Sequence, residues 1–479
     1  MALTVPLSEI VQKSSNPLLA KHESWGRVLL GDVATVLNGF AFKSSEFSNS
    51  GGVPLIRIRD IGKDRSETTY LGEYDPRYVV EPGDLLVGMD GDFNCARWRG
   101  PLGLLNQRVC KITLKSDIYL PKFLDYTLPG YLKAINDVTS SVTVKHLSSK
   151  SIEEIPLPLP PKEVQQRLVA EIEKQFSRLD EAVVNLKRVK ANLKRYKASV
   201  LKAAVEGKLT EDWRKQHPNV EPASKLLERI LAERRAKWKG KGAYKEPAAP
   251  DTTGLSELPE GWVWASLDQV TSKITSGSRD WSPYYGIGTS IFVLAQNVRP
   301  LSPDFSIQQL VDPPADDPSC ERSRIKEGDL LATIVGANTG QVCLVSQMPG
   351  IAYVCQSVAL MRPVLVEMSL YLNCWLNSTE HGQRYFERCM YGQGRPHLSF
   401  EQLMATPIAV PSIIEQRHIV ADVERRFSFI REIERQVGIN LFRAQRLRQS
   451  ILVTAFSGRL IGGGHNSLKL TVIEETEHV

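Results

Sequence analysis

The chain of 479 residues is 42% hydrophobic and 24% charged, with 60 Lys and Arg against 54 Asp and Glu and a net charge of +6. This length predicts two to four domains, and the composition is that of a soluble protein with no expected membrane span or secretion leader. The seven cysteines never form Cys-x-x-Cys, which favours free thiols in a reducing cytoplasm and argues against a zinc site.

The first part of the chain predicts an N-terminal arm at 1–20 and a globular domain at 21–160. The runs at 53–61 and 84–89 are rich in β-forming residues and are bounded by Gly and Pro, which predicts strands. The domain is expected to end in a proline-punctuated strand at 155–161. Proline can also begin the first turn of a following helix.

A long helical spacer is predicted at 161–210. Its apolar residues recur every three or four positions, which is typical of a coiled-coil seam. Gly207 provides a C-terminal stop. A helix of about 40 residues spans about 60 Å. The expected seam positions are Ile172, Phe176, Leu179, Val183, Leu186 and Leu193.

A basic linker at 211–257 contains one short amphipathic helix between Pro-rich connectors. The second globular domain is predicted at 258–411. It contains expected strands at 290–298 and 329–335 and ends in another proline-punctuated strand at 406–411.

A second helical spacer is predicted at 412–460, followed by a flexible tail at 461–479. Two seams in one chain favour an antiparallel coiled coil within the chain, which would keep the domains apart. Homodimerisation through the same seams is the alternative. The seam positions of the second helix are Val423, Phe427, Ile430, Val437, Leu447 and Ile451.

The second half of the chain repeats the first. At an offset of 251, 18 of the 64 residues from 146 to 209 are identical to those from 397 to 460. Upstream the offset drifts, and Gly-Asp-Leu-Leu recurs at 83–86 and 328–331, where the glycine can adopt positive φ. The predicted fold is α+β, a tandem repeat of two α/β domains separated by two long helices that form an antiparallel coiled coil.

Some recurring residues indicate a structural role common to both halves. The pairs are Trp25 and Trp262, Gln107 and Gln356, and His146 and His397. The two tryptophans are expected to anchor the cores. Ser148 and Ser399, which follow the recurring His-Leu, are expected to be helix N-caps.

The chain lacks the sequence motifs of the enzymes that act on DNA or nucleotides. It has no Asn/Asp-Pro-Pro-aromatic loop, no GxxxxGK[ST] phosphate loop, and no GxSxG or HExxH motif. We therefore predict no catalytic residue, no metal site and no cofactor bound by this chain. Two similar domains on a spacer suggest measurement of distance along a linear partner, for which DNA is the natural candidate.

The repeated segments IPLPLPPKEVQQRLVAEIE and PIAVPSIIEQRHIVADVE, followed by helices that close in SVLKAAVEGKLTEDW and SILVTAFSGRL, resemble the specificity subunit of type I restriction-modification systems. The resemblance extends from about Trp25 to Leu460. The Pro-x-x-x-Glu-Gln-x-x-Ile-Val signature is complete in the second copy. In the first copy Val164 stands where the second has Glu415.

The resemblance implies two target-recognition domains, each of which reads one half of an asymmetric, bipartite sequence in double-stranded DNA. It implies a non-catalytic cytoplasmic subunit that binds two modification (methyltransferase) subunits and, through them, two restriction (translocase and nuclease) subunits. S-adenosylmethionine, ATP and Mg belong to those partners, and no membrane is involved. The alternatives are a two-headed coiled-coil adaptor for another methyltransferase class, a protein-binding scaffold, or an undetected hydrolase.

Direct readout of bases needs Arg or Lys for guanine, Asn or Gln for adenine, and acidic groups for cytosine. In the first domain the loop candidates are Lys43, Arg57, Arg59, Asp90, Gln107, Arg108 and Lys145. In the second they are Ser278, Arg279, Gln296, Asn297, Arg299, Asn338, Gln393, Arg395 and His397. For each residue the alternative is a solvated side chain or an internal hydrogen bond.

The charge is unevenly placed along the chain. Residues 247–415 carry 10 basic and 17 acidic groups, whereas residues 165–209 carry 11 basic and 5 acidic groups. The basic excess therefore belongs to the helices and linker rather than to the expected reading domains. We expect the isolated chain to bind DNA weakly, because phosphate contacts supply most of the affinity.

Overall fold

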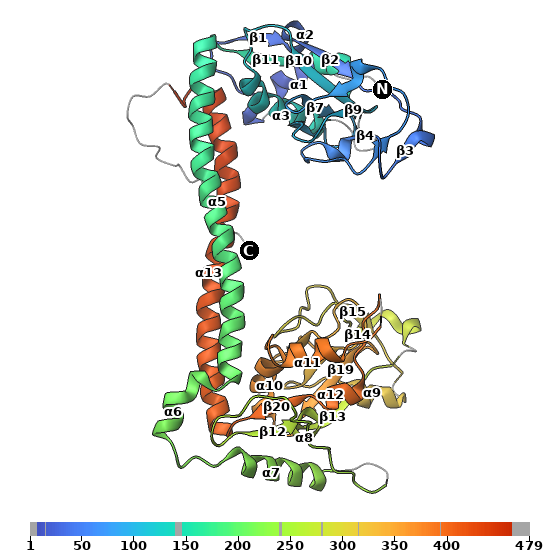
Figure 1. Ribbon diagram of the computed structural model, residues 1–479, viewed down its shortest axis with the longest axis vertical. Helices are drawn as coiled ribbons and strands as arrows, with labels where there is room; N and C mark the ends of the chain where they lie inside the picture. Colours follow the sequence, from blue (N-terminus) through green and yellow to red (C-terminus); the bar gives the residue numbers. More distant parts are fainter. Residues whose placement is uncertain are drawn as a thin grey trace. The chain divides into compact units, whose positions relative to one another are not determined.

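The structure is a computed structural model that describes residues 7–14, 16–138, 146–238, 242–278, 281–314, 316–392 and 394–461 (Figure 1). The chain divides into two compact units. Unit 1 comprises residues 1–187 and 438–479, and unit 2 comprises residues 188–437. Each unit therefore combines one globular domain with parts of both long helices.

An antiparallel four-stranded sheet forms the centre of the domain in unit 1, in the order β2–β10–β7–β8. In strand β10, Cys110 pairs with Asn38 of β2 and with Val87 of β7. The expected strand at 84–89 is confirmed as β7. The strands are β2 (Ala34–Asn38), β7 (Leu85–Gly88), β8 (Cys95–Arg97) and β10 (Val109–Leu114).

A second sheet of unit 1 has the order β3–β5–β4–β9–β6, in which β4 and β9 are parallel. The strand expected at 53–61 ends at Ile56, so the prediction of a strand at 57–61 was wrong. The Asp60 carboxylate accepts a hydrogen bond from Arg57 N at 3.0 Å, which closes a 3₁₀ turn there. The strands are β3 (Phe47–Ser48), β4 (Val53–Ile56), β5 (Thr69–Tyr70), β6 (Val79–Val80) and β9 (Gly103–Leu105).

The helices of unit 1 cover this framework. Trp25 is buried in the main core of the unit, as expected. The Ser148 hydroxyl accepts a hydrogen bond from Ser151 N at 3.1 Å, which confirms the predicted N-cap. The elements are α1 (Leu7–Lys13), α2 (Leu30–Val33), α3 (Pro121–Val138), α4 (Ser149–Glu153), and the paired strands β1 (Gly26–Leu29) and β11 (Pro156–Leu159). Short 3₁₀ helices lie at Pro17–Leu19, Ser44–Glu46, Ile58–Asp60 and Pro76–Tyr78.

The domain of unit 2 repeats the same framework. Its four-stranded sheet has the order β13–β19–β16–β17, and β14 pairs in parallel with β18, as β4 does with β9. The common frame inferred from the repeat is present. The strands are β12 (Val263–Ser266), β13 (Thr271–Ser276), β14 (Tyr285–Val293), β15 (Gln309–Val311), β16 (Leu330–Thr333), β17 (Val342–Leu344), β18 (Ala352–Val354), β19 (Val358–Pro363) and β20 (Pro407–Val410).

The helices of unit 2 include α7, the short helix expected in the basic linker, and α6, which lies where the sequence predicted only a connector. The buried Trp262 and the N-cap at Ser399, which accepts from Gln402 N at 3.2 Å, are also as predicted. The helices are α6 (Glu211–Gln216), α7 (Ala223–Ala236), α8 (Leu267–Val270), α9 (Pro318–Ser323), α10 (Ser369–Leu376), α11 (Gly382–Cys389) and α12 (Phe400–Met404). Short 3₁₀ helices lie at Lys208–Thr210, Ser282–Tyr284 and Val366–Met368.

The recurring Gly-Asp-Leu-Leu segment does more than form a turn. Gly83 and Gly328 have φ of 100° and 89°, as expected. The carboxylate of Asp329 accepts from Lys326 N at 2.7 Å and binds the guanidinium of Arg362 on β19 at 2.6 and 2.7 Å. In unit 1, Asp84 makes the corresponding turn contact with Glu81 N at 2.9 Å and lies 3.2 Å from Lys111 on β10. The aspartate therefore ties the turn to the neighbouring strand.

The two long helices are α5 (Lys162–Val205) and α13 (Ile413–Phe456), each of 44 residues. None of the helices formed by the described residues is both long enough and apolar enough to cross a membrane. All twelve expected seam residues are buried or half-buried. Val189 and Tyr196, which follow the same spacing, are 39% and 43% exposed and lie outside the closely packed seam.

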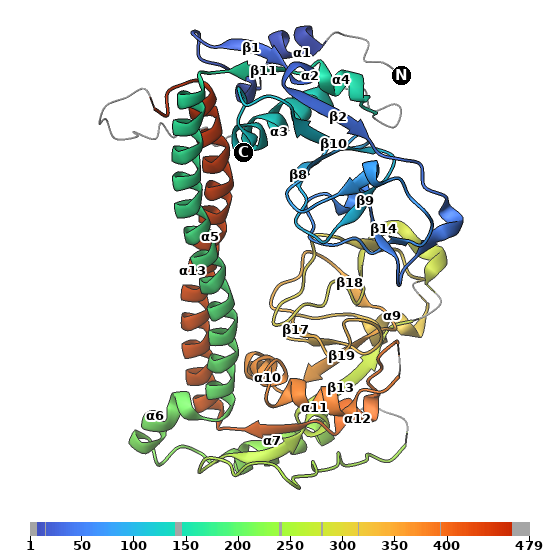
Figure 2. The ribbon, with the colours of Figure 1, turned by 45° about the horizontal axis from the view of Figure 1, so that its top comes forward.

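Parts of α5 and α13 pack against each other within each unit, where they lie side by side in both views (Figures 1 and 2). In unit 1 the Arg448 guanidinium lies 4.3 Å from the centre of the Phe176 ring and pairs with Asp180. In unit 2, Lys197 Nζ lies 2.7 Å from Glu434 Oε2, and Leu193 packs in one cluster with Phe427.

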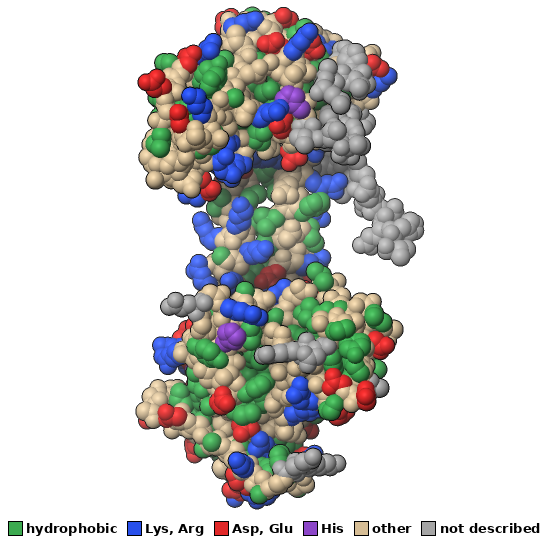
Figure 3. Space-filling model, turned by 90° about the vertical axis from the view of Figure 1, so that its right-hand side faces the viewer, with side chains coloured by type: hydrophobic (Ala, Val, Ile, Leu, Met, Phe, Trp, Pro, Cys, Tyr) green, Lys and Arg blue, Asp and Glu red, His purple; other side chains and the backbone are tan. Residues whose placement is uncertain are grey.

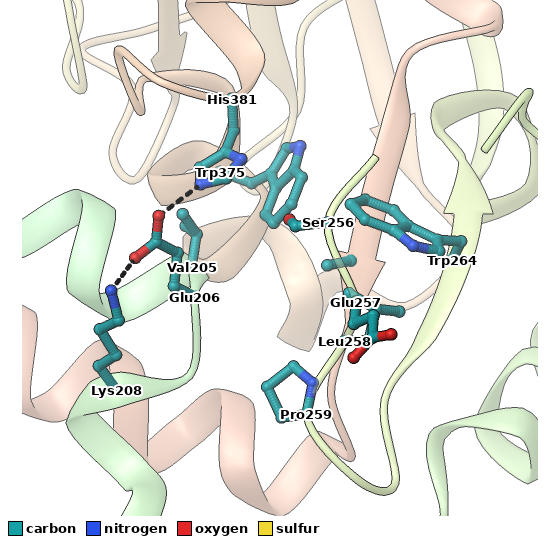
Figure 4. Close-up of a pocket in the computed structure, with 11 residues that line it drawn as sticks. Val205, Glu206, Lys208, Ser256, Glu257, Leu258, Pro259, Trp264, Trp375 and His381 are labelled. Atoms are coloured by element: carbon teal, nitrogen blue, oxygen red, sulfur yellow. Dashed lines mark hydrogen bonds and ion pairs between the residues drawn. The ribbon is translucent and has the colours of Figure 1, made fainter. Parts of the chain in front are cut away.

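The end of α5 docks onto the domain of unit 2 beside a hollow of about 310 Å³ (Figure 4). Glu206 Oε1 lies 3.4 Å from His381 Nε2, and its other oxygen lies 2.6 Å from Lys208 Nζ. The His381 ring stacks on Trp375 with centroids 5.1 Å apart. Burial lowers the pKa of His381, although the Glu206 carboxylate acts in the opposite direction.

Candidate nucleic-acid interface

Three segments of main chain meet at one end of the central sheet in unit 1. Met89 N, just after β7, donates to Arg108 O at 2.8 Å. Leu147 N, just before α4, donates to Met89 O at 2.7 Å, and Asp90 forms an isolated antiparallel bridge with His146. The contacts of residues 89 and 90 with residues 146 and 147 join parts of the chain that lie more than 50 positions apart, and the bond from Met89 to Arg108 adds the third segment.

The side chains at this junction form a charged cluster of Asp90, Arg108 and His146. His146 Nδ1 lies 2.6 Å from Asp90 Oδ1 and 3.2 Å from Arg108 Nη1. Arg108 Nε lies 3.6 Å from Asp90 Oδ2. The structure therefore unites two of the residues predicted to read bases with the recurring histidine.

Other candidates of unit 1 are distributed over separate loops. Arg57 and Arg59 both donate to the Thr68 hydroxyl, so these two guanidinium groups are at least partly engaged inside the domain. Lys43 and Gln107 are exposed. Only the Asp90–Arg108–His146 cluster joins candidates from different loops of this domain among the residues that the structure describes.

The corresponding region of unit 2 is a hollow of about 460 Å³. Ser278 and Gln356 line it together with Val335. His397 bridges Val335 in the main chain, and its ring stacks on Tyr391 with centroids 5.7 Å apart. The recurring histidine therefore occupies an equivalent bridge in both units, while its side chain has different neighbours.

Asn297 is not available for the base contact expected from the sequence. It is 2% exposed, its oxygen accepts from Leu294 N at 2.9 Å, and its amide nitrogen donates to Asp304 O and Ile307 O at 2.9 and 2.7 Å. These bonds close the turn after β14, which is why the strand expected to reach residue 298 ends at Val293. Sequence reasoning cannot distinguish such an internal asparagine from an exposed one.

The remaining candidates of unit 2 are peripheral to the hollow. Gln296, Arg299 and Arg395 are exposed, and the Asn338 amide donates to Ala295 O at 3.5 Å. Three predicted residues lie outside the described part of the structure: Lys145, Arg279 and Gln393.

Comparison with known proteins identifies the family. The family model for the type I restriction modification DNA specificity domain matches residues 22–194. The chain is 33% identical to the type I restriction enzyme EcoBI specificity subunit of Escherichia coli, over 96% of this chain and 91% of that protein. This chain belongs to the family of type I restriction specificity subunits.

Two other comparisons agree with this assignment. The type I restriction enzyme EcoKI specificity subunit of Escherichia coli (strain K12) is 22% identical over 91% of this chain and 89% of that protein. A solved chain also matches, with a TM-score of 0.60 and 19% identity. It comes from a structural study of complex assembly and conformational transition in the type I R-M system. It covers 92% of this chain and 99% of the matched chain, so the fold is that of a known structure.

As a type I specificity subunit, the chain is a DNA-recognition protein without catalytic activity of its own. The seven cysteines are free thiols, and burial raises the pKa of Cys110 and Cys343 to about 12. A thiol with so high a pKa stays protonated at neutral pH and is a poor nucleophile.

Unit 2 of the specificity subunit exposes an apolar surface that the sequence reasoning missed. Ile287 is 56% exposed in a bulge of β14 between Gly286 and Gly288, whose φ values are 76° and 79°. Ile307, near β15, is 68% exposed. Hydrophobic side chains also gather on the face of the unit that Figure 3 shows. In the sequence, the Tyr-Gly-Ile-Gly run at 285–288 was the feature that could have indicated this exposed isoleucine.

The same view shows how charge is distributed on the specificity subunit. On this face the two globular domains carry Lys and Arg side chains interspersed with acidic ones, whereas the visible part of the long helices carries mainly Lys and Arg (Figure 3).

Proposed function

We propose that the two domains of this specificity subunit read the two halves of an asymmetric, bipartite sequence in double-stranded DNA. The observation that carries the proposal is that both domains have the same framework but carry different side chains at equivalent loop positions. At equivalent positions, Asp90 and Arg108 of unit 1 correspond to Val335 and Ser357 of unit 2. Domains that differ in this way are expected to prefer different bases, so the target is not a palindrome.

Helices α5 and α13 form, in this proposal, an antiparallel coiled coil that sets the distance between the half-sites. The buried seam residues support it, as do the contacts of Arg448 with Asp180 and of Lys197 with Glu434 in the separate units. A helix of 44 residues is about 66 Å long. Tilted across the duplex, such a spacer reaches half-sites that lie about one helical turn, or about 34 Å, apart.

The specificity subunit is further proposed to bind two modification subunits and, through them, two restriction subunits. The repeat supports two equivalent binding sites, because it presents the same framework twice. The mixed charge of the two globular domains supports a division of labour in which partners supply phosphate contacts. S-adenosylmethionine, ATP and Mg would serve the partners and not this chain.

The test is the methylation pattern of genomic DNA from a host that carries this chain with its modification subunit. We expect methylation within one asymmetric motif of two specified parts separated by an unspecified spacer of constant length. Exchanging residues 258–411 for the corresponding domain of a relative should change one part only. Inserting one seam heptad into each helix should change the spacer length without altering either part.

Methylation without any sequence motif would overturn the proposal of bipartite reading. A motif whose two parts both change after exchange of one domain would contradict separate reading by each domain. If the isolated chain and its complex with the modification subunit both lack salt-dependent binding to DNA, a protein-binding scaffold becomes the better explanation.

A further inference from the structure

Arg108 has a backbone conformation that favours glycine. Its φ is 71°, and it is the third residue of a turn in which Val109 N donates to Asn106 O at 3.2 Å. Glycine and asparagine are the usual residues at a turn position with positive φ. An arginine there is under strain, and strain of this kind in a well-packed loop is a reason to look for a function.

The turn that carries Arg108 is fixed from two sides by main-chain hydrogen bonds. Gln107 N donates to Phe40 O at 2.8 Å, and Met89 N donates to Arg108 O at 2.8 Å. Both neighbouring segments belong to the framework of the domain. The position of the arginine is therefore determined by the packed sheet end and not by a freely moving loop.

The Asp90 carboxylate supports the inner side of the Arg108 guanidinium, and His146 acts on the guanidinium through that carboxylate. His146 Nδ1 lies 2.6 Å from Asp90 Oδ1 and 3.2 Å from Arg108 Nη1. A histidine nitrogen that donates a proton to Asp90 cannot at the same time accept one from Arg108. The shorter contact therefore orients the carboxylate, whose second oxygen lies 3.6 Å from Arg108 Nε.

The exposed fractions of the three side chains show which of them lies outermost. The side chain of Arg108 is 54% exposed, whereas those of His146 and Asp90 are 31% and 22% exposed. Arg108 is thus the outermost member of the cluster, supported by a carboxylate at its base. Such support reduces the number of side-chain conformations that must be given up on binding.

The charged members of the cluster are particular to unit 1. The repeat places Val335 and Ser357 where unit 1 has Asp90 and Arg108, although the histidine is common to both units. A residue with a purely structural role in the framework should recur, as the histidine does. A residue that determines which base is read should differ between domains that read different half-sites.

Arginine that is held from one side recognises guanine through the N7 and O6 acceptors in the major groove. We infer that Arg108 reads a guanine in the half-site of the domain in unit 1, and that Asp90 and His146 are positioning residues for it. This inference rests on the proposed function and names one base contact within it.

The experiment compares genomic methylation by complexes of the modification subunit with the full-length wild-type chain or with Arg108→Gly. Glycine suits the turn, so this variant should express and assemble at least as well as the wild type. We expect the wild-type motif to lose its preference for guanine at one position of one half-site by about 10- to 100-fold, with every other position unchanged.

Asp90→Asn tests the positioning role. It should weaken the preference for the same base, by less than Arg108→Gly does. The double variant should lose no more of that preference than Arg108→Gly alone. A merely structural role of Asp90 would lower methylation at all sites without changing the preference at that base. Arg425→Ala is the control, because Arg425 is also an exposed arginine paired with an aspartate, but on α13.

Three results would overturn the inference. Arg108→Gly could leave the motif unchanged, or it could lower methylation uniformly at all sites, which would make Arg108 a phosphate contact. It could also relax a position that is not a guanine. In all three cases the wild-type motif remains bipartite. If the wild-type chain itself yields no bipartite motif, the proposed function fails, and the inference fails with it.

Discussion

Glu415 Oε2 accepts a hydrogen bond from the indole nitrogen of Trp262 at 2.9 Å. Its other oxygen accepts from Thr210 and from Arg214 at 2.6 and 2.5 Å, and Glu415 is 3% exposed. At the equivalent position of unit 1, Val164 packs in the apolar core that contains Trp25. The first copy of the signature therefore departs from the second because a buried ion pair is replaced by apolar packing.

Glu415→Ala should destabilise unit 2 by about 3–5 kcal/mol, because it leaves the partly buried Arg214 charge without its partner. The double variant Glu415→Val with Arg214→Met should recover most of the loss, since it imitates the apolar arrangement of unit 1. Hydrogen exchange in the full chain measures both, with the amides of unit 1 as an internal reference. A double variant no more stable than Glu415→Ala would contradict this account.

Gly207→Ala should lower the free energy of unfolding by more than about 1–2 kcal/mol, which is the loss expected from the left-handed backbone conformation alone. Gly207 has φ of 69°, and a Cβ there would lie 2.9 Å from Pro259 Cγ and 3.0 Å from Trp262 Cζ2. Gly261→Ala is the matched control, because its φ is 82° and the space around a Cβ is open. Equal loss of thermal stability in the two variants would show that the close approach contributes nothing.

Ile430→Ala should destabilise the packing of α13 on α5 in unit 2 by about 2–5 kcal/mol, because Ile430 is fully buried. Phe429→Ala should change stability by less than about 0.5 kcal/mol, because Phe429 is 67% exposed. Urea unfolding followed by circular dichroism compares these neighbours. A larger effect at Phe429 would indicate that this face binds another chain.

Asp329→Asn should destabilise unit 2 by about 3 kcal/mol, because it breaks a bidentate contact with Arg362 at a residue that is 1% exposed. Asp84→Asn should cost about 1 kcal/mol in unit 1, since Asp84 and its partner Lys111 are more accessible to water. Hydrogen exchange of β7 and β16 reports each effect separately. The prediction fails if the two substitutions cost the same.

Acidification should lower the folding stability of unit 2 through the buried His381. Burial holds its folded pKa below the unfolded value of about 6.5. The unfolded chain therefore binds the proton first, so this contribution is complete above about pH 6.5 and declines as the pH falls below it. His381→Phe should flatten that decline in thermal unfolding between pH 5 and 8. An unchanged slope in the variant would assign the pH dependence to other groups.

The sequence by itself determined the repeat, the long helices and the positions of the main turns. Offset identity needs no structure, and a spacing of three and four residues follows from helix geometry. Gly207 could be assigned as a helix stop because positive φ strongly favours glycine. Its φ is 69°, and Gly458, its counterpart at the offset of 251, has a φ of 77°. The same local logic identified Ser148 and Ser399 as helix caps.

Only the tertiary structure decided which candidate side chains are available to DNA. The side-chain amide of Asn297 is of the kind that recognises adenine, yet it closes a turn inside the domain. Arg108, Asp90 and His146 come from three separate segments and meet because main-chain hydrogen bonds join those segments. Local patterns cannot reveal such contacts, because they depend on how distant strands pair and pack.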